Sequence, residues 1–151
     1  MKSKTRSCLH KATWTIALLL VAACSGTDSP AGMHLCSVVN QSEVDQIIGT
    51  NAGPGEHSAP FVNVEVCVWH AGGSTLTLRR FPSPEGGIAD ALGGADVILQ
   101  ADGTAFAAND SEMSVAVEDG RATLVIELSP AQSERRIALT NLANRAAERS
   151  P

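Results

Sequence analysis

Residues 113–128, MSVAVEDGRATLVIEL, carry the strongest structural signal of the chain, two alternating segments on either side of an Asp-Gly pair. Successive side chains of a strand point to opposite faces, so this alternation indicates strands with one apolar face. An Asp-Gly pair between two such segments is typical of a tight hairpin turn. We therefore predict a β-hairpin with a two-residue turn at Asp119-Gly120 and an apolar face that consists of Met113, Val115, Val117, Ala122, Leu124, Ile126 and Leu128.

A second pair of strands is predicted upstream. In residues 61–70, FVNVEVCVWH, valines alternate onto one face, and Cys67 and Trp69 fall on the other. Gly72 and Gly73 then allow a turn, and residues 74–81, STLTLRRF, return as a strand. Its neighbouring arginines, 79 and 80, face opposite sides, so we interpret them as a polar strand edge and not as an anion site. One more strand is expected at residues 104–108.

Helices are predicted between these strands. Residues 37–49, SVVNQSEVDQIIG, have apolar residues at helical spacing and end in a glycine. Glu43 and Asp45 fall in the first turn, where we interpret them as a solvated helix start and not as a catalytic pair. Further helices are expected at residues 86–92 and from Ser129-Pro130 onward, the latter with an apolar stripe of Ala138, Leu142 and Ala146.

The order of these elements predicts the fold class. Hairpins with interspersed helices are typical of an α+β domain. We expect residues 35–150 to form a single domain, with an antiparallel sheet of four to five strands and the helices packed on one face.

The N-terminus has the pattern of an export signal. A basic start is followed by the uncharged, mostly apolar residues 14–23, a run well short of the roughly 20 residues that span a bilayer. The end of this run, Val21-Ala22-Ala23-Cys24, resembles the lipobox of bacterial lipoproteins. That resemblance implies cleavage between Ala23 and Cys24 and acyl chains, including a diacylglyceryl group, on Cys24. We thus expect a signal peptide at 1–23, a flexible tether at 24–34 and an extracytoplasmic, membrane-anchored domain; the alternatives are a secreted protein cleaved nearby or a short buried helix.

Charge and composition argue against several function classes. Four of the 11 basic residues precede Cys24 and all 16 acidic residues follow it, so the chain from Cys24 has a formal charge of 7 − 16 = −9. Such a chain is repelled by nucleic acids and by anionic headgroups. Its few aromatic residues also give little material for a carbohydrate-stacking site.

Two cysteines, Cys36 and Cys67, remain in the predicted domain. In an oxidising compartment this pair predicts one disulfide, and the alternative is two unpaired buried thiols. We expect no metal site and no cofactor, because the chain has no CxxC motif and because His34, His57 and His70 lack the spacing of convergent ligands.

Several of these segments together resemble a family. LCSVVNQSEVDQIIGT at 35–50, VCVWH at 66–70, Gly103-Thr104-Ala105 and the final hairpin and helix are similar to short actinobacterial lipoproteins that are catalogued as a domain of unknown function. The resemblance implies a surface lipoprotein in which Cys36 and the Cys-x-Trp strand form a disulfide, and it implies no reaction. The helix around Glu43 to Gly49 is also similar to the extracellular sensor domain of mycobacterial receptor kinases.

For function, the sequence favours a binding module. It has no GxSxG elbow, HExxH pair or Walker loop, so we name no catalytic residues. We expect a non-catalytic domain that presents a surface to another envelope protein, with Trp69, His70 and the loop at 50–60 as the candidate surface. For Trp69 we favour packing on the disulfide over this surface role. The alternative functions are a lipid or small-molecule carrier or sensor, with a cavity between valine faces and helices, and, with least support, an envelope hydrolase.

Overall fold

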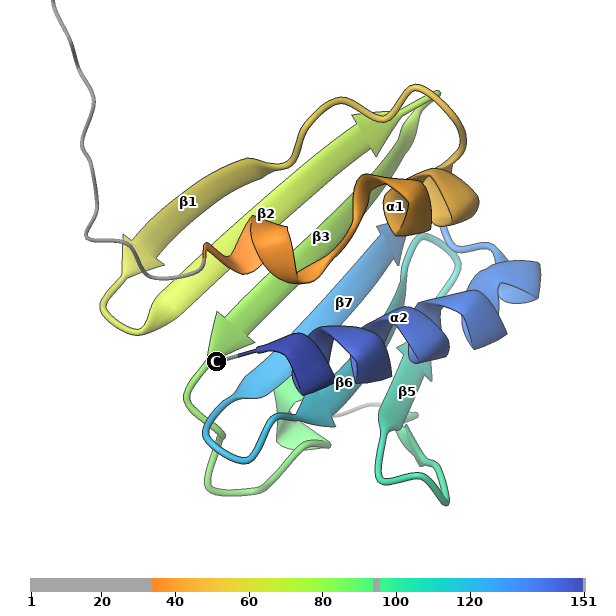
Figure 1. Ribbon diagram of the computed structural model, residues 1–151. Helices are drawn as coiled ribbons and strands as arrows, with labels where there is room; N and C mark the ends of the chain where they lie inside the picture. Colours follow the sequence, from red (N-terminus) through yellow and green to blue (C-terminus); the bar gives the residue numbers. More distant parts are fainter. Residues whose placement is uncertain (1–33, 94–95, 151) are drawn as a thin grey trace, which may run out of the picture. The chain divides into compact units, whose positions relative to one another are not determined.

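Seven antiparallel strands form one sheet in the order β1-β2-β3-β7-β6-β5-β4 (Figure 1). The structure is a computed structural model and describes residues 34–93 and 96–150. The strands are β1 (Glu56–Phe61), β2 (Val64–Ala71), β3 (Ser74–Phe81), β4 (Ile98–Leu99), β5 (Ala105–Ala108), β6 (Met113–Glu118) and β7 (Thr123–Ser129).

The predicted α+β class with an antiparallel sheet is confirmed, but the predicted strand number was too low. Residues 56–60 were expected to be part of a loop and Phe61 to begin the next strand, but residues 56–61 instead form the edge strand β1. All six of its residues are exposed, so the strand has no apolar alternation that a sequence pattern could reveal. The short strand β4 at the opposite edge was also missed.

The centre of the sheet is the pairing of β3 with β7, which runs from Thr75↔Ser129 to Phe81↔Thr123. The arginines of β3 are therefore not at a strand edge, which corrects that expectation. Arg79 forms an ion pair with Glu127 on the neighbouring strand, and Arg80 Nε lies 3.0 Å from an Asp119 carboxylate oxygen. Each arginine can lie in the middle of the sheet because an acidic side chain there compensates its charge.

The β6–β7 hairpin has the predicted apolar face, since Met113, Val115 and Val117 pair with Leu128, Ile126 and Leu124. Its turn is longer than predicted: the strands end at Glu118 and Thr123, which leaves residues 119–122 as the connection. The Asp119 carboxylate accepts hydrogen bonds from the backbone N–H groups of Arg121 and Ala122 and so organises this longer loop. Burial raises the pKa of Asp119, but these bonds and one from Arg80 outweigh it and lower the pKa.

Both α-helices lie on the same face of the sheet, here called the inner face (Figure 1). The short 3-10 helix η1 (Leu35–Val38) precedes α1 (Gln41–Ile48), and η3 (Ser133–Arg135) precedes α2 (Arg136–Arg149). Gly49, with a φ of 99°, ends α1 as predicted. Within the described residues, none of the helices has the length and apolar character needed to cross a membrane.

The core lies between these helices and the inner face. Leu139, Leu142, Ala143 and Ala146 of α2 are fully buried. Ala138 is partly buried and packs against the same core, so all three positions of the predicted stripe face it. The helix begins later than Pro130, because Gln132 still has extended backbone angles. The segment predicted to be helical at 86–92 forms turns and only the short 3-10 helix η2 (Asp90–Leu92).

The opposite, outer face of the sheet is covered unevenly. Over β5, β6 and β7, a small cluster of Ala105, Ala116 and Val125 is packed against apolar side chains of residues 81–97. Over β2, the outward side chains Val64, Val66 and Val68 remain half-exposed. The sheet thus has one filled face and one face that is open over its N-terminal half.

Candidate functional site

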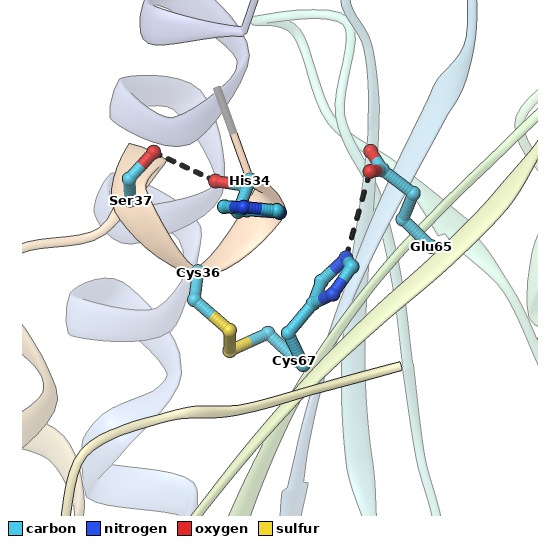
Figure 2. The surroundings of a disulfide bond; sticks show 6 residues. His34, Cys36, Ser37, Glu65 and Cys67 are labelled. Atoms are coloured by element: carbon cyan, nitrogen blue, oxygen red, sulfur yellow. Dashed lines mark hydrogen bonds and ion pairs between the residues drawn. A yellow bond between two sulfur atoms is a disulfide. The ribbon is translucent and has the colours of Figure 1, made fainter. Parts of the chain in front are cut away.

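The predicted disulfide is confirmed and lies on the inner face of β2. Cys36 of η1 is bonded to Cys67, a residue 31 positions later that pairs with both β1 and β3 (Figure 2). Cys67 is fully buried, whereas Cys36 is half-buried. The bond fixes the first turn of the domain to the sheet.

Trp69 lies beside this disulfide in the core and is only 3 % exposed. The backbone of Gly55 covers both groups, because a Cβ atom at Gly55 would lie 2.5 Å from Cys67 Sγ and 2.7 Å from Trp69 Nε1. Trp69 therefore packs within the core and offers no surface, which corrects its place in the candidate binding surface. The valine face and the Cys67–Trp69 face are opposite, as predicted, and it is the latter that faces the helices.

Two histidines meet next to the disulfide. The ring centroids of His34 and His57 are 5.0 Å apart, and His57 Nε2 lies 3.5 Å from Glu65 Oε1. Figure 2 shows His34 above the Cys36–Cys67 bond and Glu65 to the right of both. No such convergence was expected, because the spacing of His34, His57 and His70 along the chain gives no sign of it. The register of His57 opposite Cys67 in the β1–β2 pair brings His57 to the inner face.

The side-chain contacts of this histidine cluster are a ring contact between His34 and His57 and a contact of the His57 imidazole with the Glu65 carboxylate. Both cysteines are bonded to each other, so neither provides a thiolate. The nearby Ser37 hydroxyl donates to the backbone carbonyl of His34 at 2.7 Å, so it is not paired with an imidazole nitrogen as a nucleophile would be. No group of three or more His, Cys, Asp or Glu side chains in residues 34–93 and 96–150 is arranged to hold a metal ion.

His70, the other candidate surface residue, lies elsewhere. It is exposed on the outer face at the end of β2, and its Nδ1 is 3.1 Å from Thr75 Oγ1 on β3. The half-exposed Val64, Val66 and Val68 lie on the same face of the same strand. We call these four residues the valine stripe.

Glu43 differs most from its expected role. It is buried, not solvated, and its carboxylate accepts hydrogen bonds of 2.6 Å from Arg145 Nε and 2.7 Å from Arg149 Nη1. It also accepts one from the backbone N–H of Asn40 in a capping box. Burial raises the pKa of Glu43, but the hydrogen bonds from Arg149, Asn40 and Arg145 outweigh it and lower the pKa to about 2.

This cluster joins α1 to the end of α2 and is structural. Asn40 and Glu43 show a capping-box pattern in the sequence, so the helix start was visible there. The arginine partners were not, because they lie 102 and 106 residues further along the chain. Asp45, by contrast, accepts a hydrogen bond from Gln41 of its own helix.

The turn between β1 and β2 carries the most exposed apolar side chains of this end of the sheet. Phe61 is 74 % and Val62 is 88 % exposed. Both line a surface hollow together with Arg80 and Arg121. We call Phe61 and Val62 the hairpin tip.

Comparison with protein-family models, with curated proteins and with solved structures found no match to this chain. The predicted signal peptide, its cleavage site at Ala23 and Cys24, and most of the tether lie outside the residues that the structure describes. Functional inference therefore rests on the chain's own surfaces.

Proposed function

We propose that this protein is a lipid-anchored, extracytoplasmic domain that binds another envelope protein and is not an enzyme. The anchor is the acylated Cys24, supported by the basic start, the short apolar run and the lipobox-like end of the signal. The binding surface is the valine stripe. The observation that carries this proposal is the half of the outer sheet face that remains open over β1–β3.

Several features suit the valine stripe to binding. Three β-branched side chains and an imidazole lie in a row along one strand, so they present a flat, rigid surface. The disulfide and both helices hold the other side of the same sheet. A pre-organised surface loses little conformational entropy when a partner binds, and contiguous exposed apolar patches mark interaction sites.

The chemistry of the stripe indicates the chemistry of its partner. The nearest charged pair on this face, Arg79 with Glu127, is already neutralised by its ion pair. The hydroxyl of Thr77, opposite Val68, adds hydrogen-bonding capacity without charge. The exposed Glu56 also lies on this face, opposite Val68 on β1. We therefore expect a partner with a flat, mainly apolar contact area and a cationic or hydrogen-bond-donating group for Glu56 at its edge.

A carrier function finds less support from the geometry. The valines that were expected to leave a cavity beside the helices point to the opposite side of the sheet. The space beneath α2 is filled by fully buried side chains such as Leu76, Leu128 and Leu139. A filled core of this kind leaves the outer surface as the place for ligands.

Site-directed photocrosslinking in intact cells tests the binding surface. A photoreactive amino acid at Val66 should form one defined adduct, and the same amino acid at Ile137, an exposed apolar residue of α2, should not. A second substitution on the same face, Thr77→Asp, should abolish the adduct, because it places an unpaired charge in the interface. Equal labelling from both positions, or an adduct that survives Thr77→Asp, would count against the valine stripe.

The anchor is tested separately by mass spectrometry of the protein extracted from its membrane. We expect a chain that begins at Cys24 with the added mass of its acyl chains. A Cys24→Ala variant should be found in the soluble fraction. An intact, unmodified N-terminus would refute the lipid anchor. The photocrosslinking experiment would still test the valine stripe, because it does not depend on the anchor.

A further inference from the structure

The hairpin tip exposes two apolar side chains at a place where turns are normally polar. Two-residue hairpin turns favour Gly, Asn and Asp. Here only Asn63 fits that pattern, with a φ of 63°, while Phe61 and Val62 project into solvent. These two side chains contribute little to the core, so their exposure calls for a partner outside the domain.

The chain enters the domain close to this tip. His34, the first described residue, lies against His57 of β1, with ring centroids 5.0 Å apart. From His57 the strand runs four residues to Phe61, a distance of about 13 Å. Figure 1 shows η1, in orange, in front of the sheet, with the β1–β2 turn to its left.

The predicted anchor lies within reach of the tip. Cys24 precedes His34 by only ten residues in the sequence (34 − 24), which extend to at most about 35 Å. A phenylalanine and a valine alone bind a bilayer weakly. A short tether makes that contact intramolecular and raises the effective concentration of the tip at the bilayer surface.

The charges near the hairpin tip allow it to approach a bilayer surface even though the domain as a whole is acidic. Two of the carboxylates there have a nitrogen partner, while Glu118 at the end of β6 is exposed: Glu65 lies 3.5 Å from His57 Nε2, and Asp119 lies 3.0 Å from Arg80 Nε. Arg121, exposed beside the same hollow, can present its guanidinium group to a phosphate. The repulsion expected from the net charge therefore does not apply equally at this end.

We infer that the hairpin tip inserts into the phospholipid bilayer that holds the acyl chains of Cys24, with Arg121 at the headgroup phosphates. The inference rests on the proposed lipid anchor. Because the strands run toward the tip, insertion stands the sheet upright on the bilayer. The valine stripe then faces sideways, where a neighbouring envelope protein can reach it.

Electron paramagnetic resonance on the full-length, acylated protein tests this contact. The protein is reconstituted into vesicles of phosphatidylcholine and phosphatidylglycerol, with a nitroxide label on Val62→Cys or, as the control, on Ile137→Cys. In the acylated, oxidised chain the introduced cysteine is the one free thiol, because Cys8 leaves with the signal, Cys24 is acylated and Cys36 and Cys67 are bonded. We expect the label at position 62 to collide several-fold less often with a water-soluble nickel complex than the label at 137.

Two further variants separate insertion from mere proximity. Phe61→Ser should restore collisions at position 62, whereas Leu99→Ser, a similarly exposed change at the far edge strand, should not. A label at 62 that is as accessible as the one at 137, on protein with a confirmed acyl mass, would overturn the inference and leave the anchor intact. An absent acyl mass would overturn both.

Discussion

The carboxylate of Glu43 accepts a hydrogen bond of 2.7 Å from Arg149 Nη1, although the two residues are 106 positions apart in the chain. Arg149 also donates to the backbone carbonyl of Val38, the last residue of η1. One side chain at the end of α2 thus holds two parts of the N-terminal segment. Since Glu43 is buried, its charge is stable there only while these donors remain in place.

We predict that Glu43→Gln destabilises the domain by about 1–3 kcal/mol, because it removes a carboxylate that accepts charged and backbone hydrogen bonds. Asp45→Asn, on the same helix but with only a Gln41 contact, should change stability by less than about 0.5 kcal/mol. Chemical denaturation of both variants measures the difference. Equal losses would mean that the cluster contributes no more than an ordinary surface contact.

Stability should also fall at acid pH because of Glu43. Its pKa is about 2 in the folded protein and 4.5 as an ordinary glutamate, so below pH 4.5 the unfolded chain takes up a proton that the folded chain does not. The contribution is complete above pH 4.5 and is lost as the pH falls toward 2. A plot of the free energy of unfolding against pH over this range should be flatter for Glu43→Gln than for the unchanged protein. A residual slope should remain from Asp119, whose pKa is also lowered in the folded protein. Parallel pH profiles for the two proteins would show that Glu43 does not cause the loss of stability at acid pH.

Two nearby glycines provide a matched pair for testing the cover of the disulfide. Gly55→Ala should destabilise the domain by about 1–3 kcal/mol, because its methyl group would lie 2.5 Å from Cys67 Sγ. Gly53→Ala meets no atom within 4 Å and should be neutral or slightly stabilising. Thermal unfolding of the two variants measures this, and the prediction fails if Gly55→Ala is as stable as Gly53→Ala.

The disulfide should contribute about 3–4 kcal/mol, since it closes a loop of 31 residues in the unfolded chain. The double variant Cys36→Ser, Cys67→Ser should unfold at correspondingly lower denaturant concentration and still fold into the same sheet. Circular dichroism and denaturation report the two properties. A variant without any cooperative transition would show that the bond is required for folding and not only for stability.

Local patterns predicted the elements whose residues alternate or repeat regularly. The β6–β7 hairpin and the helix that ends at Gly49 were visible because their apolar residues follow one clear period. The edge strand β1 was not, since it is exposed throughout, includes Pro60 and changes register between Ser58 and Phe61. Missing β1 also hid the contact of His57 with His34.

Relations between distant segments were the least predictable part. The pairing of β3 with β7 gave Arg79 and Arg80 their acidic partners, and the packing of α2 on α1 buried Glu43. Neither follows from sequence spacing, because both depend on which elements become neighbours in space. Packing of Trp69 on the disulfide was the favoured prediction, but a surface role stayed open because the pattern distinguished two faces of its strand and not which one the helices would cover.

The central position of the β3–β7 pair has a consequence for how the chain folds. β1, β2 and β3 are complete in sequence at Phe81, yet the strand that flanks β3 on its other side ends only at Ser129. The N-terminal three strands therefore remain a partial sheet with an unprotected edge until the chain as far as Ser129 is available for pairing. Long-range pairing of this kind slows folding, so we expect this domain to acquire its structure late and in a single cooperative step.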